Sequence, residues 1–104
     1  MNRPEIVAQI KKAMAEQQPN VQVVLYGSEA RGDARIDSDI DLLLLVDADN
    51  VSVETENAIT MPLYKIELQS GVTISSVVMT LSQWYDRKIK TPFYINVMND
   101  GIRL

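Results

Sequence analysis

The sequence contains no cysteine and no histidine among its 104 residues. Disulfide bonds, thiolate zinc sites and imidazole chemistry are therefore excluded. A metal ion could be held only by oxygen ligands, which selects Mg²⁺, Mn²⁺ or Ca²⁺. The longest uninterrupted aliphatic run, Leu42–Val46, is far too short to span a membrane, so we expect no membrane association.

Charge and composition narrow the class of protein further. Acidic residues outnumber basic residues by 14 to 10, and the formal charge of −4 argues against strong nucleic-acid binding through a basic surface. Hydrophobic residues make up 46% and charged residues 23% of the chain, as in globular domains. We expect a single domain over residues 1–104. No apolar signal segment follows Met1–Glu5, so we expect an intracellular, cytoplasmic protein.

Hydrophobic periodicity predicts alternating helices and strands. The first helix contains Pro4 in its first turn, carries apolar residues at helical spacing up to Met14, and ends at Pro19-Asn20. Pro62 should kink the next long helix or delay its start. This alternation predicts an α/β (α+β) fold in which helices pack on a small sheet. Strands are expected at Val21–Tyr26, Ile40–Val46, Val72–Thr80 and, as an edge strand, Ile102–Leu104; further helices are expected at Val53–Ser70, Ser82–Lys88 and Pro92–Asn99.

Acidic residues gather in one short segment. Six of them fall within seventeen residues: Asp33, Asp37, Asp39, Asp41, Asp47 and Asp49. We interpret all but Asp39 and Asp41 as solvated loop residues. These two begin an aliphatic strand, whose period of two places both side chains on one face, about 6–7 Å apart, where they can hold one cation. Two adjacent carboxylates repel each other, and a bound cation would offset that repulsion.

A turn between the first strand and a short helix precedes this pair. Gly27 permits close backbone approach, and Ser28 is placed to cap a helix that begins at Glu29–Arg31. Its hydroxyl and backbone N–H are then available to a phosphate group, whose oxygens Arg31 and Arg35 could neutralise. A phosphate-holding turn followed by a strand with paired carboxylates is the arrangement that a metal–triphosphate site requires.

The stretch Gly27-Ser28-Glu29-Ala30-Arg31-Gly32, followed by Ser38-Asp39-Ile40-Asp41-Leu42, resembles the GSx₁₀DxD signature of the minimal nucleotidyltransferases in the DNA polymerase β-like superfamily. The resemblance implies a nucleotidyltransferase fold, with a small mixed sheet flanked by helices. It implies that Asp39 and Asp41 are catalytic residues and bind Mg²⁺ or Mn²⁺, with ATP as the substrate. The nucleotide-binding residues that it implies are Gly27, Ser28, Arg31 and Gly32.

The same resemblance implies a reaction and a partner. A nucleoside monophosphate, usually AMP from ATP, would be transferred to a hydroxyl group. Small members of the family are often encoded beside a HEPN-type ribonuclease toxin and act as antitoxins, in some cases by adenylylating a toxin tyrosine. The expected partners are therefore a nucleoside triphosphate and a HEPN-type toxin. A transferase acting on an antibiotic or a nucleic acid is least favoured, because we expect no extra domain to hold such an acceptor.

One part of the family pattern is missing. A third carboxylate usually lies on a later strand, where it helps to bind a second metal ion and can accept the proton of the attacking hydroxyl. The expected strand Val72–Thr80 contains no acid, and Ser75 or Ser76 occupies the place. We favour Ser75, whose neighbours on its face are more polar; Glu67 and Asp86 fit the solvent side of helices. The alternative function is therefore an antitoxin module that binds nucleotide and partner with weak or no catalysis.

Overall fold

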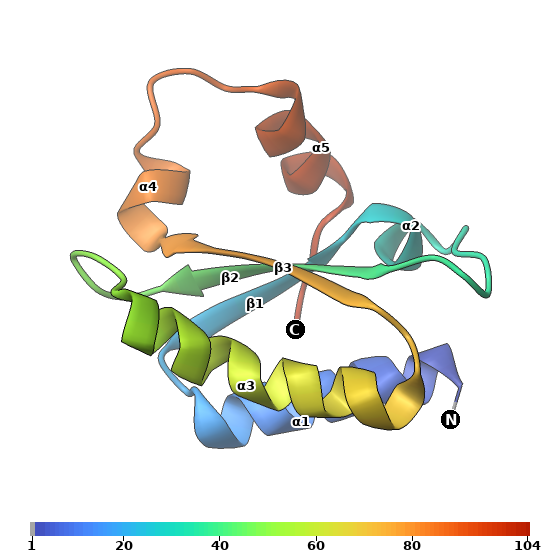
Figure 1. Cartoon of the computed structure of the whole chain (residues 1–104). Coiled ribbons are helices and arrows are strands. Elements are labelled where there is room, and N and C mark those ends of the chain that lie inside the picture. Colours follow the sequence, from blue (N-terminus) through green and yellow to red (C-terminus); the bar gives the residue numbers. More distant parts are fainter. Residues whose placement is uncertain (1) are drawn as a thin grey trace.

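The structure, a computed structural model, describes residues 2–104 (Figure 1). In chain order the elements are α1 (Arg3–Gln17), β1 (Val21–Tyr26), α2 (Gly27–Arg31), β2 (Ile40–Val46), α3 (Val53–Ser70), β3 (Ile74–Thr80), α4 (Leu81–Tyr85), α5 (Pro92–Asp100) and β4 (Ile102–Arg103). The four strands form one sheet in the order β3-β2-β1-β4. β1 runs antiparallel to β2 and to β4, whereas β2 and β3 are parallel, so the sheet is mixed and the predicted α/β fold is confirmed.

Helices cover both faces of the sheet. In Figure 1, α1 and α3 lie together on one face, and α4 and α5 lie on the other. Leu42 and Leu44 of β2 belong to the core cluster formed with α1 and α3, whereas Leu43 and Leu45 pack in a second cluster with Trp84 of α4. β2 is therefore buried on both faces, as its continuous apolar sequence predicts for a central strand. Alternate positions of β2 thus face different helix layers.

Local signals set most helix ends. The side chain of Asn2 accepts a hydrogen bond from the backbone N–H of Glu5 at the start of α1. Ser52 caps α3 in the same way, and Gly71, at a φ of +73°, ends that helix. Pro62 lies buried inside α3 and does not delay its start, which remains at Val53. Among the described residues, no helix combines the length and the apolar character that crossing a bilayer requires.

The largest differences from the predicted element ends lie at β3 and at the helix α4 that follows it, which ends at Tyr85 rather than at the predicted Lys88, with Asp86 as its C-cap. The strand begins at Ile74 rather than Val72, because the carboxylate of Glu67 accepts the backbone N–H of Ile74 at 2.8 Å. At its other end, Thr80 and Gln83 form a capping box that starts α4 at Leu81, earlier than predicted. Glu67 is half-buried, so its interpretation as a solvent-facing residue was wrong. Its carboxylate is engaged in holding the start of β3.

Candidate functional site

Asp39 and Asp41 lie at the beginning of β2. Asp41 is half-buried in the strand, and Asp39, which is exposed, precedes the strand by one residue. Burial raises the pKa of the Asp41 carboxyl, and the negative charge of Asp39 raises it further. The two carboxylates are therefore close enough to repel each other, as the sequence predicted. Because Asp41 precedes Leu43 by two residues, its side chain lies on the sheet face that α4 and α5 cover.

Gly27 brings the chain directly against Asp41. Its φ is +75°, in the left-handed region that favours glycine, and a Cβ atom built at this position would lie 2.5 Å from Oδ2 of Asp41. No other residue fits here without movement of the carboxylate or the turn. Gly27 therefore permits a close backbone approach, here to the Asp41 carboxylate, and its predicted contact with a phosphate group stays a prediction.

The short helix α2 differs from its prediction. It begins at Gly27, with Tyr26 as the N-cap and no side-chain capping hydrogen bond, so the prediction that Ser28 caps the helix was wrong. The positive φ of Gly27 turns the chain into the helix one residue before Ser28. The Ser28 carbonyl accepts hydrogen bonds from the N–H groups of Gly32 and Asp33, each at 3.0 Å. Gly32, at a φ of +82°, ends α2 and is exposed.

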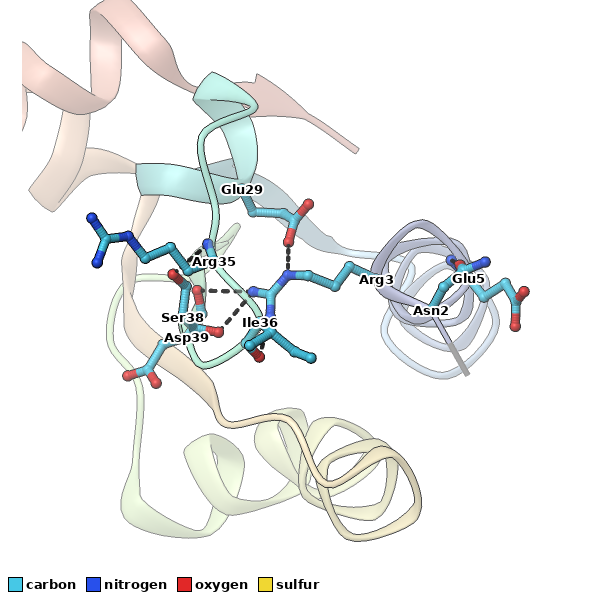
Figure 2. A network of polar contacts seen from close by, with 8 residues as sticks. All are labelled: Asn2, Arg3, Glu5, Glu29, Arg35, Ile36, Ser38 and Asp39. Atoms are coloured by element: carbon cyan, nitrogen blue, oxygen red, sulfur yellow. Dashed lines mark hydrogen bonds and ion pairs between the residues drawn. The ribbon is translucent and has the colours of Figure 1, made fainter.

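Arg31 is the basic residue that acts on the carboxylate pair. Its charge lowers the pKa of Asp41, against the larger effects of burial and Asp39. The guanidinium forms ion pairs with Asp33 at 3.3 Å and with Asp100 of α5 at 3.7 Å. Arg35 is exposed, and its guanidinium points away from the network drawn in Figure 2. Arg31 is therefore held near the pair, while Arg35 extends from the loop that leads to Asp39.

The other acidic residues of the segment are exposed, as predicted: Asp33, Asp37, Asp47 and Asp49.

The register of β3 identifies the residue that replaces a third carboxylate. Ser75 pairs with Asp41 across the parallel strands, is exposed, and lies on the same sheet face. Ser76 pairs with Leu42 on the opposite face and lines a cavity of about 370 Å³ between α3 and β3. The prediction that Ser75, rather than Ser76, lies on the same sheet face as Asp41 is confirmed. Within residues 2–104 no three acidic side chains gather in a way that could hold a metal ion, and Asp86 is exposed.

Two residues near the pair were not singled out from the sequence. Tyr26 pairs with Asp41 across β1 and β2, and burial, followed by the charge of Asp41, raises the pKa of its hydroxyl. Its ring packs edge-to-face on Phe93 of α5, with centroids 5.4 Å apart. Arg3 of α1 contacts the loop before Asp39 (Figure 2). Strand pairing would have identified Tyr26; no local sequence pattern marks Arg3.

Residues 7–103 match the model of the "Nucleotidyltransferase domain" family, which covers the carboxylate pair, the Gly27 turn and all four strands. The chain belongs to the nucleotidyltransferase domain family. The sequence resemblance to this family is therefore confirmed.

Two relatives and one solved structure are similar to this chain in sequence or in fold. The chain is 34% identical over 80 residues to "Putative protein adenylyltransferase MJ0604" of Methanocaldococcus jannaschii, covering 77% of this chain and 73% of that protein. It is 32% identical over 83 residues to "Putative protein adenylyltransferase MJ0141" of the same organism, covering 80% and 77%. It also superposes on a chain of the "Crystal structure of the toxin-antitoxin with AMP-PNP" with a TM-score of 0.62, 22% identity, and 92% and 69% coverage. That likeness supports the nucleotidyltransferase fold.

The contact between Gly27 and Asp41 yields a stability prediction. Gly27→Ala and Gly71→Ala both place a side chain at a positive φ, which costs about 1–2 kcal/mol of unfolding free energy. Only Gly27→Ala also sets a Cβ against a carboxylate, because nothing lies within 4 Å of the Cβ position at Gly71. We expect Gly27→Ala to lose roughly 1–3 kcal/mol more than Gly71→Ala in urea denaturation. Equal losses would show that Asp41 does not constrain the turn.

The raised pKa of Asp41 yields a pH prediction. The folded protein binds this proton more tightly than the unfolded chain, so the contribution to folding is complete below the ordinary value of 3.8 and is lost as pH rises through the folded pKa. Asp41→Asn should therefore unfold at a higher temperature than wild type at neutral pH. The difference should vanish as pH falls below 3.8. The exposed control Asp49→Asn should show no such gap at any pH. A loss of stability at neutral pH in Asp41→Asn would contradict the raised pKa of Asp41.

Proposed function

We propose that this chain is a single nucleotidyltransferase domain that transfers AMP from ATP to a hydroxyl group on a protein. The observation that carries the proposal is the meeting of the Asp39–Asp41 pair with the Gly27 turn and Arg31 at the start of β2. The adenylyltransferase names of the two relatives supply the transferred group and the protein acceptor. The solved toxin–antitoxin structure with AMP-PNP supplies the nucleotide class.

The residues of the site fit a divalent cation. Asp39 and Asp41 offer hard carboxylate oxygens, the ligands that Mg²⁺ and Mn²⁺ prefer. Their mutual repulsion, which Arg31 offsets only in part, favours a positive ion between them. The bound ion would neutralise negative charge on the phosphate groups as pyrophosphate leaves. Asp39 and Asp41 are the proposed ligands.

The turn and the short helix are proposed to hold the phosphate groups. Ser28 offers its hydroxyl and backbone N–H, Arg31 offers a guanidinium that two carboxylates keep near the pair, and Gly32 ends the helix. In the reaction, the acceptor oxygen forms a bond to the α-phosphorus, and the bond from that phosphorus to the bridging oxygen breaks, which releases pyrophosphate. The residue beside Asp41 is Ser75, not a carboxylate, so the acceptor proton passes to solvent water with no third carboxylate to accept it, and transfer should be slow.

The proposed acceptor is a tyrosine of a HEPN-type toxin, which makes the protein an antitoxin. The second candidate is an antitoxin that binds nucleotide and toxin with little or no transfer. The specific observation favouring it is Ser75 at the position next to Asp41. Both candidates require ATP binding that depends on the carboxylate pair, and only the first requires a covalent product.

A transfer assay tests the proposal. ATP labelled at the α-phosphate, with Mg²⁺ and a co-purified toxin partner, should give labelled toxin. Asp39→Asn and Asp41→Asn should each lower the rate by roughly 10²–10³-fold. Asp49→Asn, an exposed acid of the same segment, should match wild type. Calorimetric titration with ATP should show weaker binding without Mg²⁺; equal affinities with and without the ion would contradict a metal-assisted site.

Ser75 offers a gain-of-function prediction with a matched control. Ser75→Asp places a carboxylate beside Asp41, where general-base assistance is typically worth about 10²–10⁴-fold in rate. Ser76→Asp adds the same charge one residue later, on the opposite face, and should not accelerate transfer. Single-turnover rates of AMP transfer give the comparison. Fast wild-type transfer that neither substitution changes would show that two carboxylates suffice, and no transfer by any variant that still binds ATP would favour the binding module.

A further inference from the structure

Arg3 joins three segments that are distant in sequence. From α1, its Nε donates to a carboxylate oxygen of Glu29 in α2, and its Nη2 donates to the carbonyl oxygen of Ser38 at 2.7 Å. Longer contacts, at 3.5 Å, reach the carbonyls of Ile36 and Asp39. Figure 2 shows the guanidinium between α2 and the loop that leads to β2. The planar fork of arginine suits such simultaneous contacts, which a single ammonium group cannot reproduce.

The pair of Arg3 and Glu29 is largely shielded from solvent. Their side chains are 17% and 16% exposed, so the attraction between them is less screened than at the surface. Hydrogen bonds from a charged donor are also stronger than those between neutral groups. Loss of Arg3 would leave the Glu29 carboxylate partly buried without its cation. The contact therefore fixes α2 and the loop relative to α1.

The loop contacts converge on the residue before β2. The carbonyl of Ser38 is held by Arg3, and the N–H of Ile40 donates to Thr73 at 2.9 Å. Within the loop, Ser38 and Arg35 exchange two further hydrogen bonds. Asp39 thus lies between two anchored peptide groups, while its carboxylate points away from Arg3 (Figure 2). Arg3 holds the backbone of Asp39 and leaves its side chain free.

We propose that Arg3 is a positioning residue that orders the loop Ile36–Asp39 and so keeps the Asp39 carboxylate beside Asp41. This inference rests on the proposed function, since positioning matters for a cation held by the pair. In the contacts described, Arg3 touches neither the Asp39 carboxylate nor the Asp41 carboxylate. Its effect passes through the loop backbone, in the way that groups outside the ligand set orient metal ligands.

Amide hydrogen exchange of the full chain without metal, followed by mass spectrometry, tests the loop directly. We compare wild type with Arg3→Ala, with Arg3→Lys, which retains the charge, and with Lys12→Ala, an exposed residue of the same helix. Exchange over residues 33–39 should accelerate about tenfold or more in both Arg3 variants, as expected for the loss of charge-assisted hydrogen bonds. Mn²⁺ binding, measured by electron paramagnetic resonance, should weaken about 10–100-fold. Lys12→Ala should change neither quantity.

The outcomes separate this inference from the proposed function. Faster exchange confined to the loop, with weaker Mn²⁺ binding, supports positioning by Arg3. Unchanged loop exchange in both Arg3 variants overturns it, and so does faster exchange spread evenly over the chain, which would show a general structural role. Wild-type protein that binds no Mn²⁺ contradicts the proposed function. If, in addition, the loop exchanges at the wild-type rate in Arg3→Lys and Arg3→Ala, the positioning role of Arg3 is overturned as well.

Discussion

The repulsion between Asp39 and Asp41 at the start of β2 is the constraint on which the site depends. β2 is one of the two central strands and is buried on both faces beyond this point, so Asp41 cannot move away from Asp39 by a shift of the strand. Asp39 precedes the strand, in the loop that Arg3 contacts. Gly27 closes one side of the space around Asp41, and Arg31 neutralises part of the charge. The proposed divalent cation would offset the negative charge that remains on the pair. The rest of the fold holds this unfavourable pair in place.

Much of the fold was predictable because its signals are local. The strands β1 and β2 match their predicted bounds residue for residue, since β-branched and aliphatic runs end at Gly27 and at Asp47. The edge strand β4 was also expected, and the structure assigns Ile102–Arg103 to it. The start of β3 was not predictable from β propensity, because its first residue donates a hydrogen bond to the Glu67 side chain of the preceding helix α3. The prediction that Ser28 caps α2 was wrong, because the positive φ of Gly27 starts the helix before Ser28.

The residues of the candidate site also fall into two groups, those that local sequence patterns predict and those that only the tertiary structure reveals. The spacing of Gly27, Ser28 and the two aspartates lies within one short segment, so the sequence alone identified it. Ser75 was favoured from strand alternation, and the parallel register places it beside Asp41. Arg3 and Tyr26 could not be found from local patterns, because their contacts with the site join residues far apart in the chain. The sequence therefore indicates the candidate site residues, and the tertiary structure adds contacts with residues far from them in the chain.

The most direct measurement is a crystal structure of the protein with Mn²⁺ and a non-hydrolysable ATP analogue, using anomalous scattering to locate the ion. The account predicts an anomalous peak between the carboxylates of Asp39 and Asp41, roughly 2.0–2.2 Å from an oxygen of each. The phosphate groups should lie against Gly27 and Ser28. A nucleotide bound with no ion at this pair, or an ion held elsewhere on the protein, would contradict the central claim.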